Sequence, residues 1–204
     1  MAFSAYKNLA TVIKEFQLHY EQADLEKITP VVAPTLLKEA IDFDLEELAY
    51  DSSEAIICET LIFPILREAW KPFRKELMLW SHQPMEAENG LSGTPDYLFA
   101  KQSELGKIVM DKPYIAIVEA KKDDFTGGWG KCAVEMYTAQ QINQNADLKI
   151  FGIVSNGKTW EFGYLEKNTL VRYKDIVSIN ELNELYSIIT HILTLCKNQI
   201  QHTV

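Results

Sequence analysis

The chain has 204 residues, 47% of them apolar, so it is long enough and apolar enough to bury a core. No apolar stretch approaches the roughly 18 residues that span a bilayer. The N-terminus lacks a basic segment followed by an apolar core, so we expect a cytoplasmic protein without a signal peptide. Three cysteines lie far apart and show neither zinc spacing nor a disulfide framework, which predicts buried free thiols at Cys58, Cys132 and Cys196.

The net charge of -9 is unevenly distributed. Residues 21–60 hold 11 acidic and 2 basic residues, whereas the rest of the chain holds 18 of each. The excess negative charge therefore disfavours nucleic-acid binding by residues 21–60, whereas the rest of the chain is neutral and could face DNA. A solvated helical surface and a surface for a protein partner both agree with the acidic region 21–60.

Helices are predicted for the first 70 residues. Aromatic and aliphatic residues recur at helical spacing over 3–22, and Pro34 suits the first turn of a helix near 34–49. Asp51, with Glu54 three positions later, forms a capping pattern that opens a third helix. Pro64 should kink or split that helix, because it lacks a backbone donor and clashes with the preceding turn. We assign residues 1–50 to an N-terminal helical region packed on the core and residues 51–204 to the main domain.

From residue 76 onward the pattern changes to short apolar runs that predict strands at 77–80, 94–100, 114–121, 149–155 and 159–165. The run at 114–121 is almost continuously apolar, which is typical of a central strand covered on both faces. Turns are predicted at Glu88-Asn89-Gly90 and Asn156-Gly157, and a loop at 101–113.

Two helices complete the predicted elements. One covers 129–146, after Gly127-Gly128, which we expect to break the chain, and a long helix covers about 180–200. The order of helices, strands, a helix, a strand pair and a closing helix predicts a mixed α/β fold.

Polar residues at two predicted strand ends carry the candidate chemistry. Glu119-Ala120-Lys121 ends the apolar run, and because side chains alternate along a strand, Glu119 and Lys121 point the same way. Pro95-Asp96 opens another strand and could bring a second carboxylate beside them. Two carboxylates and one ammonium group form a hard-cation site suited to breaking a phosphodiester.

Pro95-Asp96 followed by Glu119-Ala120-Lys121 resembles the motif of the PD-(D/E)XK nuclease superfamily. The segment 151–162 is similar to the hairpin in N-terminal nuclease domains of type I restriction motor subunits. The similarity covers residues 55–165. It implies a restriction-endonuclease-like mixed central sheet flanked by helices, with an N-terminal helical region and a long C-terminal helix.

The resemblance also implies an activity, which is hydrolysis of DNA with magnesium or manganese. Asp96 and Glu119 would be metal ligands, with the carbonyl of Ala120 as a third ligand and Glu59 as an additional acidic one. Lys121 would orient the attacking water or stabilise charge in the transition state. Many members carry a polar residue on the following helix, where Lys131, Glu135 and Gln140 are the alternatives, with Glu135 and Gln140 as candidate accessory residues.

Other residues have two readings. Basic side chains either contact DNA phosphates or form a solvated helix end, and these are Arg67, Lys71, Arg74, Lys75 and Lys122. Trp129 either packs in the core or over the site, which we favour, or stacks on a base. The histidines His19, His82, His191 and His202 show no metal or triad spacing, so we assign them no role.

The leading hypothesis is a magnesium- or manganese-dependent deoxyribonuclease of a restriction, repair or mobile-element system. Because duplex cutting usually needs two active sites, a homodimer is expected. The alternative is an inactive nuclease-like module that binds a protein partner or nucleic acid. A metabolic α/β enzyme is disfavoured, because the chain has no GxGxxG motif, P-loop or nucleophile elbow.

Overall fold

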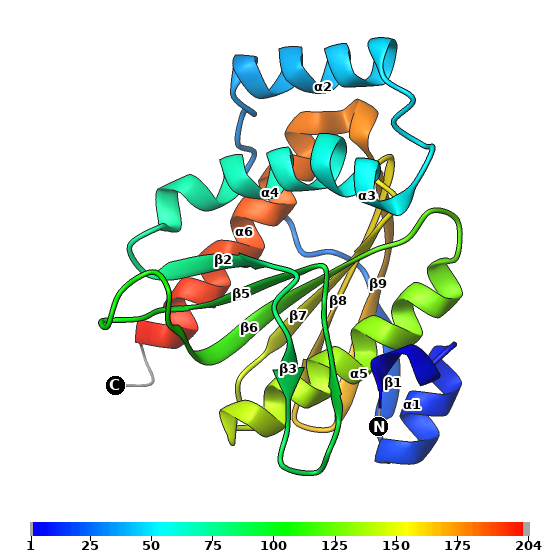
Figure 1. The fold of residues 1–204 in the computed structure, drawn as a ribbon, viewed down its shortest axis with the longest axis vertical. Helices are drawn as coiled ribbons and strands as arrows, with labels where there is room; N and C mark the ends of the chain where they lie inside the picture. The colour runs from blue at the N-terminus through cyan, green and yellow to red at the C-terminus, as the bar shows by residue number, and fades with distance from the viewer. Residues whose placement is uncertain (1, 202–204) are drawn as a thin grey trace.

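The computed structural model describes residues 2–201 and shows a mixed α/β fold, as predicted (Figure 1). In this part of the chain a seven-stranded mixed sheet has the strand order β1-β9-β8-β7-β6-β5-β2. The strands of the sheet are β1 (His19–Ala23), β2 (Leu77–Ser81), β5 (Tyr97–Gln102), β6 (Met110–Ala120), β7 (Ile150–Ser155), β8 (Thr159–Glu166) and β9 (Thr169–Ser178). A separate short hairpin pairs β3 (Met85–Glu86) with β4 (Ser92–Gly93).

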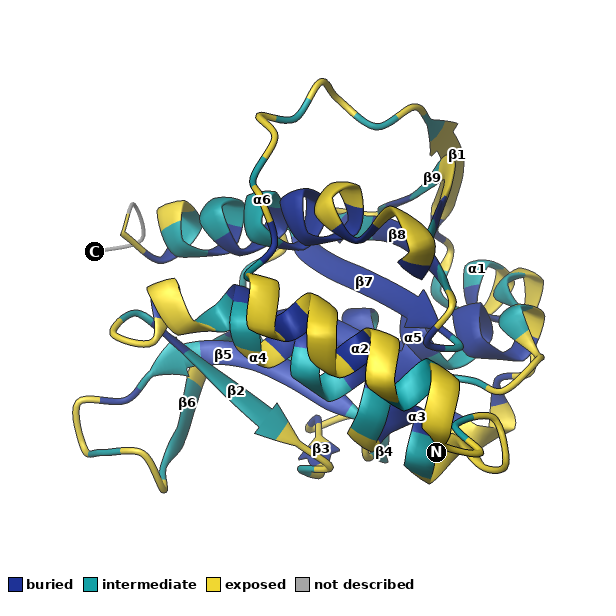
Figure 2. Cartoon of the chain, turned by 90° about the horizontal axis from the view of Figure 1, so that it is seen from above, coloured by how far each residue is buried: buried dark blue, intermediate teal, exposed yellow. Residues whose placement is uncertain are grey.

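Helices cover both faces of this sheet (Figures 1 and 2). One face carries α2 (Thr35–Glu47), α3 (Glu54–Ile57), α4 (Phe63–Trp70) and α6 (Leu182–Gln201), and the other carries α1 (Leu9–Phe16) and α5 (Phe125–Asn143). Short 3-10 turns are η1 (Phe3–Ala5), η3 (Lys71–Phe73) and η4 (Ile179–Glu181). Within residues 2–201, every helix is too short or too polar to span a lipid bilayer.

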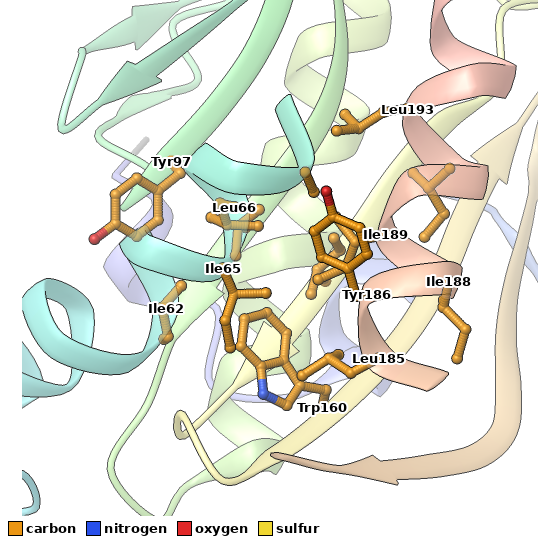
Figure 3. Packing of buried hydrophobic residues seen from close by; sticks show 14 of the residues in the cluster. Ile62, Ile65, Leu66, Tyr97, Trp160, Leu185, Tyr186, Ile188, Ile189 and Leu193 are labelled. Carbon is orange, nitrogen blue, oxygen red and sulfur yellow. The ribbon is translucent and has the colours of Figure 1, made fainter. Parts of the chain in front are cut away.

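A large apolar cluster fills the space between the sheet and the α4/α6 layer. Trp160 of β8 is fully buried there, and Figure 3 shows it close to Ile65 of α4 and Leu185 of α6. A second cluster lies under α5 and includes Ile117 and Trp129. Burial on both faces explains why residues 114–120 read as an almost continuous apolar run. The three cysteines are buried free thiols, as predicted.

The predicted helix over 3–22 is wrong in its second half. The segment forms η1, α1 and then the strand β1, which pairs in parallel with β9. Gln17 ends α1 in the left-handed conformation with φ 54°, and the backbone N–H of His19 donates to the carbonyl of Asn168 at 2.7 Å. Strand β9 was also not predicted. The division at residue 50 stays a prediction, but its N-terminal part contributes a strand to the central sheet.

The third helix begins two residues later than its acidic pair suggests. Ser53 is the N-cap, and its side chain accepts from the N–H of Ile56 at 3.3 Å, so Asp51 does not cap it. The predicted kink or split at Pro64 takes the form of a change in helix type: the backbone stays helical from α3 through a π-helical segment, η2 (Cys58–Ile62), into α4, whose first turn contains Pro64. Helix α2 agrees with its prediction.

The predicted break at Gly127-Gly128 is wrong, because both glycines lie in the first turns of α5. The Asp124 side chain caps that helix by accepting from the N–H of Gly127 at 2.8 Å. A Cβ atom at Gly128 would lie 2.7 Å from Val154 Cγ1 and 2.9 Å from Lys121 Cγ. The glycine therefore permits close packing of α5 on the sheet rather than a turn.

The remaining predicted elements are confirmed with shifted ends. Strand β5 begins at Tyr97 rather than at residue 94, and β6 begins at Met110, inside the predicted loop. Gly90 adopts φ 80° in the predicted turn, and Gly157 adopts φ 82° between β7 and β8. The long C-terminal helix is α6.

Candidate functional site

Pairing of β5 with β6 brings Asp96 to the end of β6. The two strands are antiparallel, with Tyr97 opposite Val118, so the residue before β5 lies beside the last residues of β6. The Asp96 carboxylate accepts a hydrogen bond from the backbone N–H of Ala120 through Oδ2 at 2.7 Å. The expected approach of Asp96 to the 119–121 stretch is therefore present.

Glu119 and Lys121 lie on the same face of β6, as the strand alternation predicts. The Lys121 Nζ lies 2.8 Å from Glu119 Oε1, and it also lies 3.8 Å from an oxygen of Glu54 on α3. The Glu119 side chain is completely buried, whereas one fifth of the Lys121 side chain is exposed. The site is thus a buried carboxylate beneath a partly accessible ammonium group.

Helix α5 adds a second ammonium group and a third acidic side chain. The Lys131 Nζ lies 2.8 Å and 2.9 Å from the two carboxylate oxygens of Glu119, and it donates to the carbonyl of Thr94 at 3.2 Å. Glu135, one turn further on, is completely buried with one oxygen 3.6 Å from the same Nζ. The structure therefore brings Lys131 and Glu135 to the site.

Burial and charge act together on these groups. Burial and the nearby negative charge of Asp96 raise the pKa of Glu119 to about 7, against the two ammonium groups, which lower it. Burial and the charge of Glu119 raise the pKa of Glu135 well above its usual range. Burial lowers the pKa of Lys131, but the carboxylates of Glu135 and Glu119 outweigh burial and raise it. The buried glutamates therefore hold a proton at mildly acidic pH, while both lysines stay charged.

Gln140 lies away from this cluster, contrary to its candidate accessory role. Its side-chain amide donates to the carbonyl of Lys167 at 2.9 Å, at the turn between β8 and β9. Gln140 is two helical turns and more beyond Lys131 on α5, close to the opposite end of the helix. Of the three helix alternatives, the contacts select Lys131 and Glu135.

His82, for which the sequence predicts no role, lies beside Asp96. Its backbone N–H donates to the carbonyl of Asp96 at 2.9 Å, and its Nε2 lies 3.6 Å from Asp96 Oδ1. The residue has φ 50°, and its Nδ1 shares a hydrogen bond with the Ser81 hydroxyl at 2.8 Å. Strand pairing places His82 there: β2 and β5 are antiparallel neighbours, so the residue after β2 lies beside the residue before β5.

Glu59 lines a cavity of about 430 Å³ next to the site, together with His82 and Tyr97. It is exposed at the surface of the π-helical segment. Burial, followed by the charge of Asp96, raises the pKa of Cys58, which lines the same cavity, to about 12. Cys58 therefore stays a thiol here, and Glu59 is the accessible acidic group.

The basic residues in the last turns of α4 and just after it lie toward the other end of β2. Helix α4 starts near the site, where Phe63 stacks on Tyr97, and runs away from it. Arg67 and Lys71 both pair with Glu68, at 3.4 Å and 2.6 Å, and the Arg74 side chain donates to the carbonyl of Lys71. Lys75 is exposed beside them. These contacts satisfy much of the cluster within the helix end, so its DNA contact stays a prediction.

Lys122 and Trp129 follow the favoured readings. Lys122 is exposed, and its backbone N–H donates to Glu54 at 3.3 Å. Trp129 is 1% exposed, and its indole N–H donates to the carboxylate of Glu161 at 2.6 Å. Trp129 is therefore a core residue that anchors the start of α5 on β8. His202 lies outside the described residues.

No group of three or more His, Cys, Asp or Glu side chains in residues 2–201 is arranged to hold a metal ion. The candidate ligands are the carboxylates of Asp96 and Glu119: Asp96 accepts from the N–H of Ala120, the residue after Glu119, and its charge raises the pKa of Glu119. Two carboxylates suffice for Mg²⁺, which keeps several of its waters. Asp96 also has an oxygen, Oδ1, that is not engaged by Ala120. The donor chemistry therefore fits a magnesium or manganese ion.

No model of a known protein family and no curated protein matches the chain. Among solved structures, it is similar to a chain described as "cryoEM structure DrdV-DNA complex", with a TM-score of 0.41 and 13% identity. The match covers 76% of this chain but 14% of that one, so the present chain spans a small part of that neighbour. A TM-score this low supports no inference about function, so the function proposed below rests on the geometry of the site.

Proposed function

We propose that this protein is a divalent-metal-dependent endonuclease that hydrolyses DNA phosphodiester bonds in restriction, repair or mobile-element defence. The observation that supports this most is the hydrogen bond from the Ala120 N–H to Asp96, which holds one carboxylate beside the Glu119–Lys121 pair. Three side chains from the adjoining ends of two strands meet there; in sequence they lie outside the acidic region 21–60, of which Glu54 and Glu59 border the site.

Asp96 and Glu119 would hold the cation, magnesium or manganese, with the carbonyl of Ala120 as a further ligand. When bound, the cation offsets the charge of the phosphate and activates water for attack. Glu59 would take part only from the neighbouring cavity, where it is accessible. His82 positions Asp96, because it contacts both the backbone and the carboxylate of that residue.

Lys121 would act as a charged donor. Burial lowers its pKa, but the carboxylates of Glu119 and Glu54 outweigh burial and raise it, so the side chain stays an ammonium group at neutral pH. A charged ammonium cannot accept a proton from water. It therefore orients the attacking water or stabilises the negative charge that develops on the phosphate in the transition state.

The test is cleavage of supercoiled plasmid, single-stranded and branched DNA in magnesium or manganese. Wild-type protein should cut at least one substrate, and Asp96→Asn and Lys121→Ala should each lower the rate by about 100-fold or more. Lys174→Ala is the matched control, because Lys174 is an exposed strand lysine paired with Asp24 on β1's side of the sheet. Absence of cleavage on every substrate with either metal would refute the proposal.

A second function is favoured by the surface of α2. Leu36 and Phe43 are exposed by 79% and 61%, although both are large apolar side chains. They lie seven positions apart and so share one face of the helix, among acidic residues of the 21–60 region. Figure 2 shows exposed residues along this helix. An apolar stripe with acidic flanks suits a protein partner that carries apolar and basic residues.

This binding function would replace the nuclease if the site is inactive. A partner captured by wild-type protein should be lost from Phe43→Ser protein and kept by Asp96→Asn protein. The reverse pattern, in which the site variant loses the partner and the α2 variant keeps it, would count against α2 as the docking surface. The expected homodimer and the cytoplasmic location stay predictions.

A further inference from the structure

The ammonium group of Lys131 lies inside a shell of oxygen atoms. Its Nζ is 2.8 Å and 2.9 Å from the two oxygens of Glu119, 3.2 Å from the Thr94 carbonyl and 3.6 Å from an oxygen of Glu135. About four fifths of the Lys131 side chain is buried, since 21% is exposed. Such a set of oxygens around one positive charge is what a bound cation has in a protein.

The same ammonium group engages both oxygens of the proposed metal ligand Glu119. Lys121 adds a second positive charge 2.8 Å from Oε1. A divalent ion that coordinates Glu119 must therefore approach two ammonium groups, and like charges at such distances repel strongly in a partly buried site. Lys121 is held by Glu54 as well, on the solvent side, whereas the oxygen partners of Lys131 all lie within the site.

We infer that Lys131 is an internal cation that neutralises Glu119 in the metal-free protein and competes with the divalent ion for that carboxylate. The inference rests on the proposed function and deepens it, because it assigns regulation of metal affinity to one residue. Metal binding and departure of the Lys131 ammonium from Glu119 are then one exchange. Lys131 sets the metal concentration at which the site loads.

The test measures Mn²⁺ binding by electron paramagnetic resonance, without DNA. Lys131→Gln keeps a polar side chain of moderate length and removes the charge, and it should bind Mn²⁺ with a dissociation constant about tenfold or more below that of wild type. Lys167→Gln is the charge-matched control. Lys167 is exposed in the turn between β8 and β9, near Asp147, and its loss should change the dissociation constant for Mn²⁺ by no more than about twofold, because distant surface charges are screened by salt. Unchanged or weaker binding by folded Lys131→Gln protein would overturn the inference.

A second measurement on the wild-type protein avoids reliance on the variant. A pulse of acetic anhydride followed by peptide mass spectrometry reports how accessible each lysine is. Acetylation of Lys131 should increase severalfold when Mn²⁺ is saturating, while that of Lys167 stays constant. A Lys131 rate that does not change while Mn²⁺ binds would also overturn the inference.

Asp96→Asn protein separates the two claims. If Asp96→Asn abolishes Mn²⁺ binding but Lys131→Gln does not strengthen it, the metal site stands and the competition does not. If the wild-type protein binds no Mn²⁺, or binds it independently of Asp96, the proposed nuclease site itself fails.

Discussion

Stability should fall as pH rises through the range in which the buried carboxyl group of Glu119 loses its proton. The pKa of Glu119 is raised from 4.5 to about 7, so between these values the folded protein binds more protons than the unfolded chain. Unfolding is then favoured by increasing pH. At about 1.4 kcal/mol per pH unit, this one group removes about 3 kcal/mol of stability between pH 4.5 and pH 8. That is a large part of the free energy of unfolding of a typical domain, which is about 5–15 kcal/mol.

The assay is urea unfolding of wild-type and Glu119→Gln protein at half-unit steps from pH 5 to pH 8, in chelator and reductant. Gln has the shape of Glu but no titrating proton, so the free energy of unfolding of wild type minus that of the variant should decrease by about 2 to 3 kcal/mol across this range. Groups far from Glu119 contribute equally to both proteins and cancel in the difference, which therefore reports Glu119 together with the carboxyl groups coupled to it, Glu135 and Asp96. Glu88→Gln, in the exposed turn before β4, is the control for loss of one carboxyl group.

The refuting result is a difference that stays flat from pH 5 to pH 8, or that increases with pH. A flat difference would mean that the two ammonium groups keep Glu119 ionised over this whole range, so that its pKa is not raised in the folded protein. The charge balance of the site described above would then be wrong.

Two further predictions concern how α5 is held on the sheet. Gly128→Ala should lower the free energy of unfolding by about 1 kcal/mol. The added methyl group crowds Val154 and Lys121, which costs about 1 to 3 kcal/mol and outweighs the gain of about 1 kcal/mol from replacing glycine in a helix. Urea unfolding measures this change, and a more stable variant would contradict the packing described. Trp129→Phe should cost about 1 to 2 kcal/mol, since it removes the indole donor to Glu161 while Arg172 still pairs with that carboxylate. An additional Glu161→Gln change should cost less in that variant than in wild type by the energy of the indole–carboxylate bond, because loss of the Arg172 pair costs the same in both; a double-mutant cycle measures this difference.

The central strands and their polar ends were predictable because their signals are local. The apolar run before Glu119 indicates a strand buried on both faces, and alternation alone places Glu119 and Lys121 together. The pairing of Asp96 with this strand end followed from one assumption, that the two strands are neighbours. The structure contains that pairing.

Features that depend on distant contacts were not predictable in the same way. The spacing over 3–22 is helical, yet its last residues form β1 because β9, about 150 residues away, offers a strand edge. Asp51 and Ser53 are both good N-cap residues, and the local sequence does not decide between them. In the structure Ser53 is the N-cap.

The second half of the site depends on how α5 is rotated against the sheet. Gly128 and the buried Trp129 fix that rotation, and they turn Lys131 and Glu135 toward Glu119 and leave Gln140 near the β8–β9 turn. All three residues were candidates from the sequence, but no local pattern indicates which of them faces Glu119. His82 was missed because its role comes from the pairing of β2 with β5 and from no spacing motif.

The most direct test of the nuclease proposal is anomalous diffraction from crystals soaked in manganese. We expect one strong peak within coordination distance of the carboxylates of Asp96 and Glu119, with the Lys131 side chain moved away from Glu119. A saturated soak in which Glu119 stays paired with both lysines and no manganese lies beside Asp96 would contradict it.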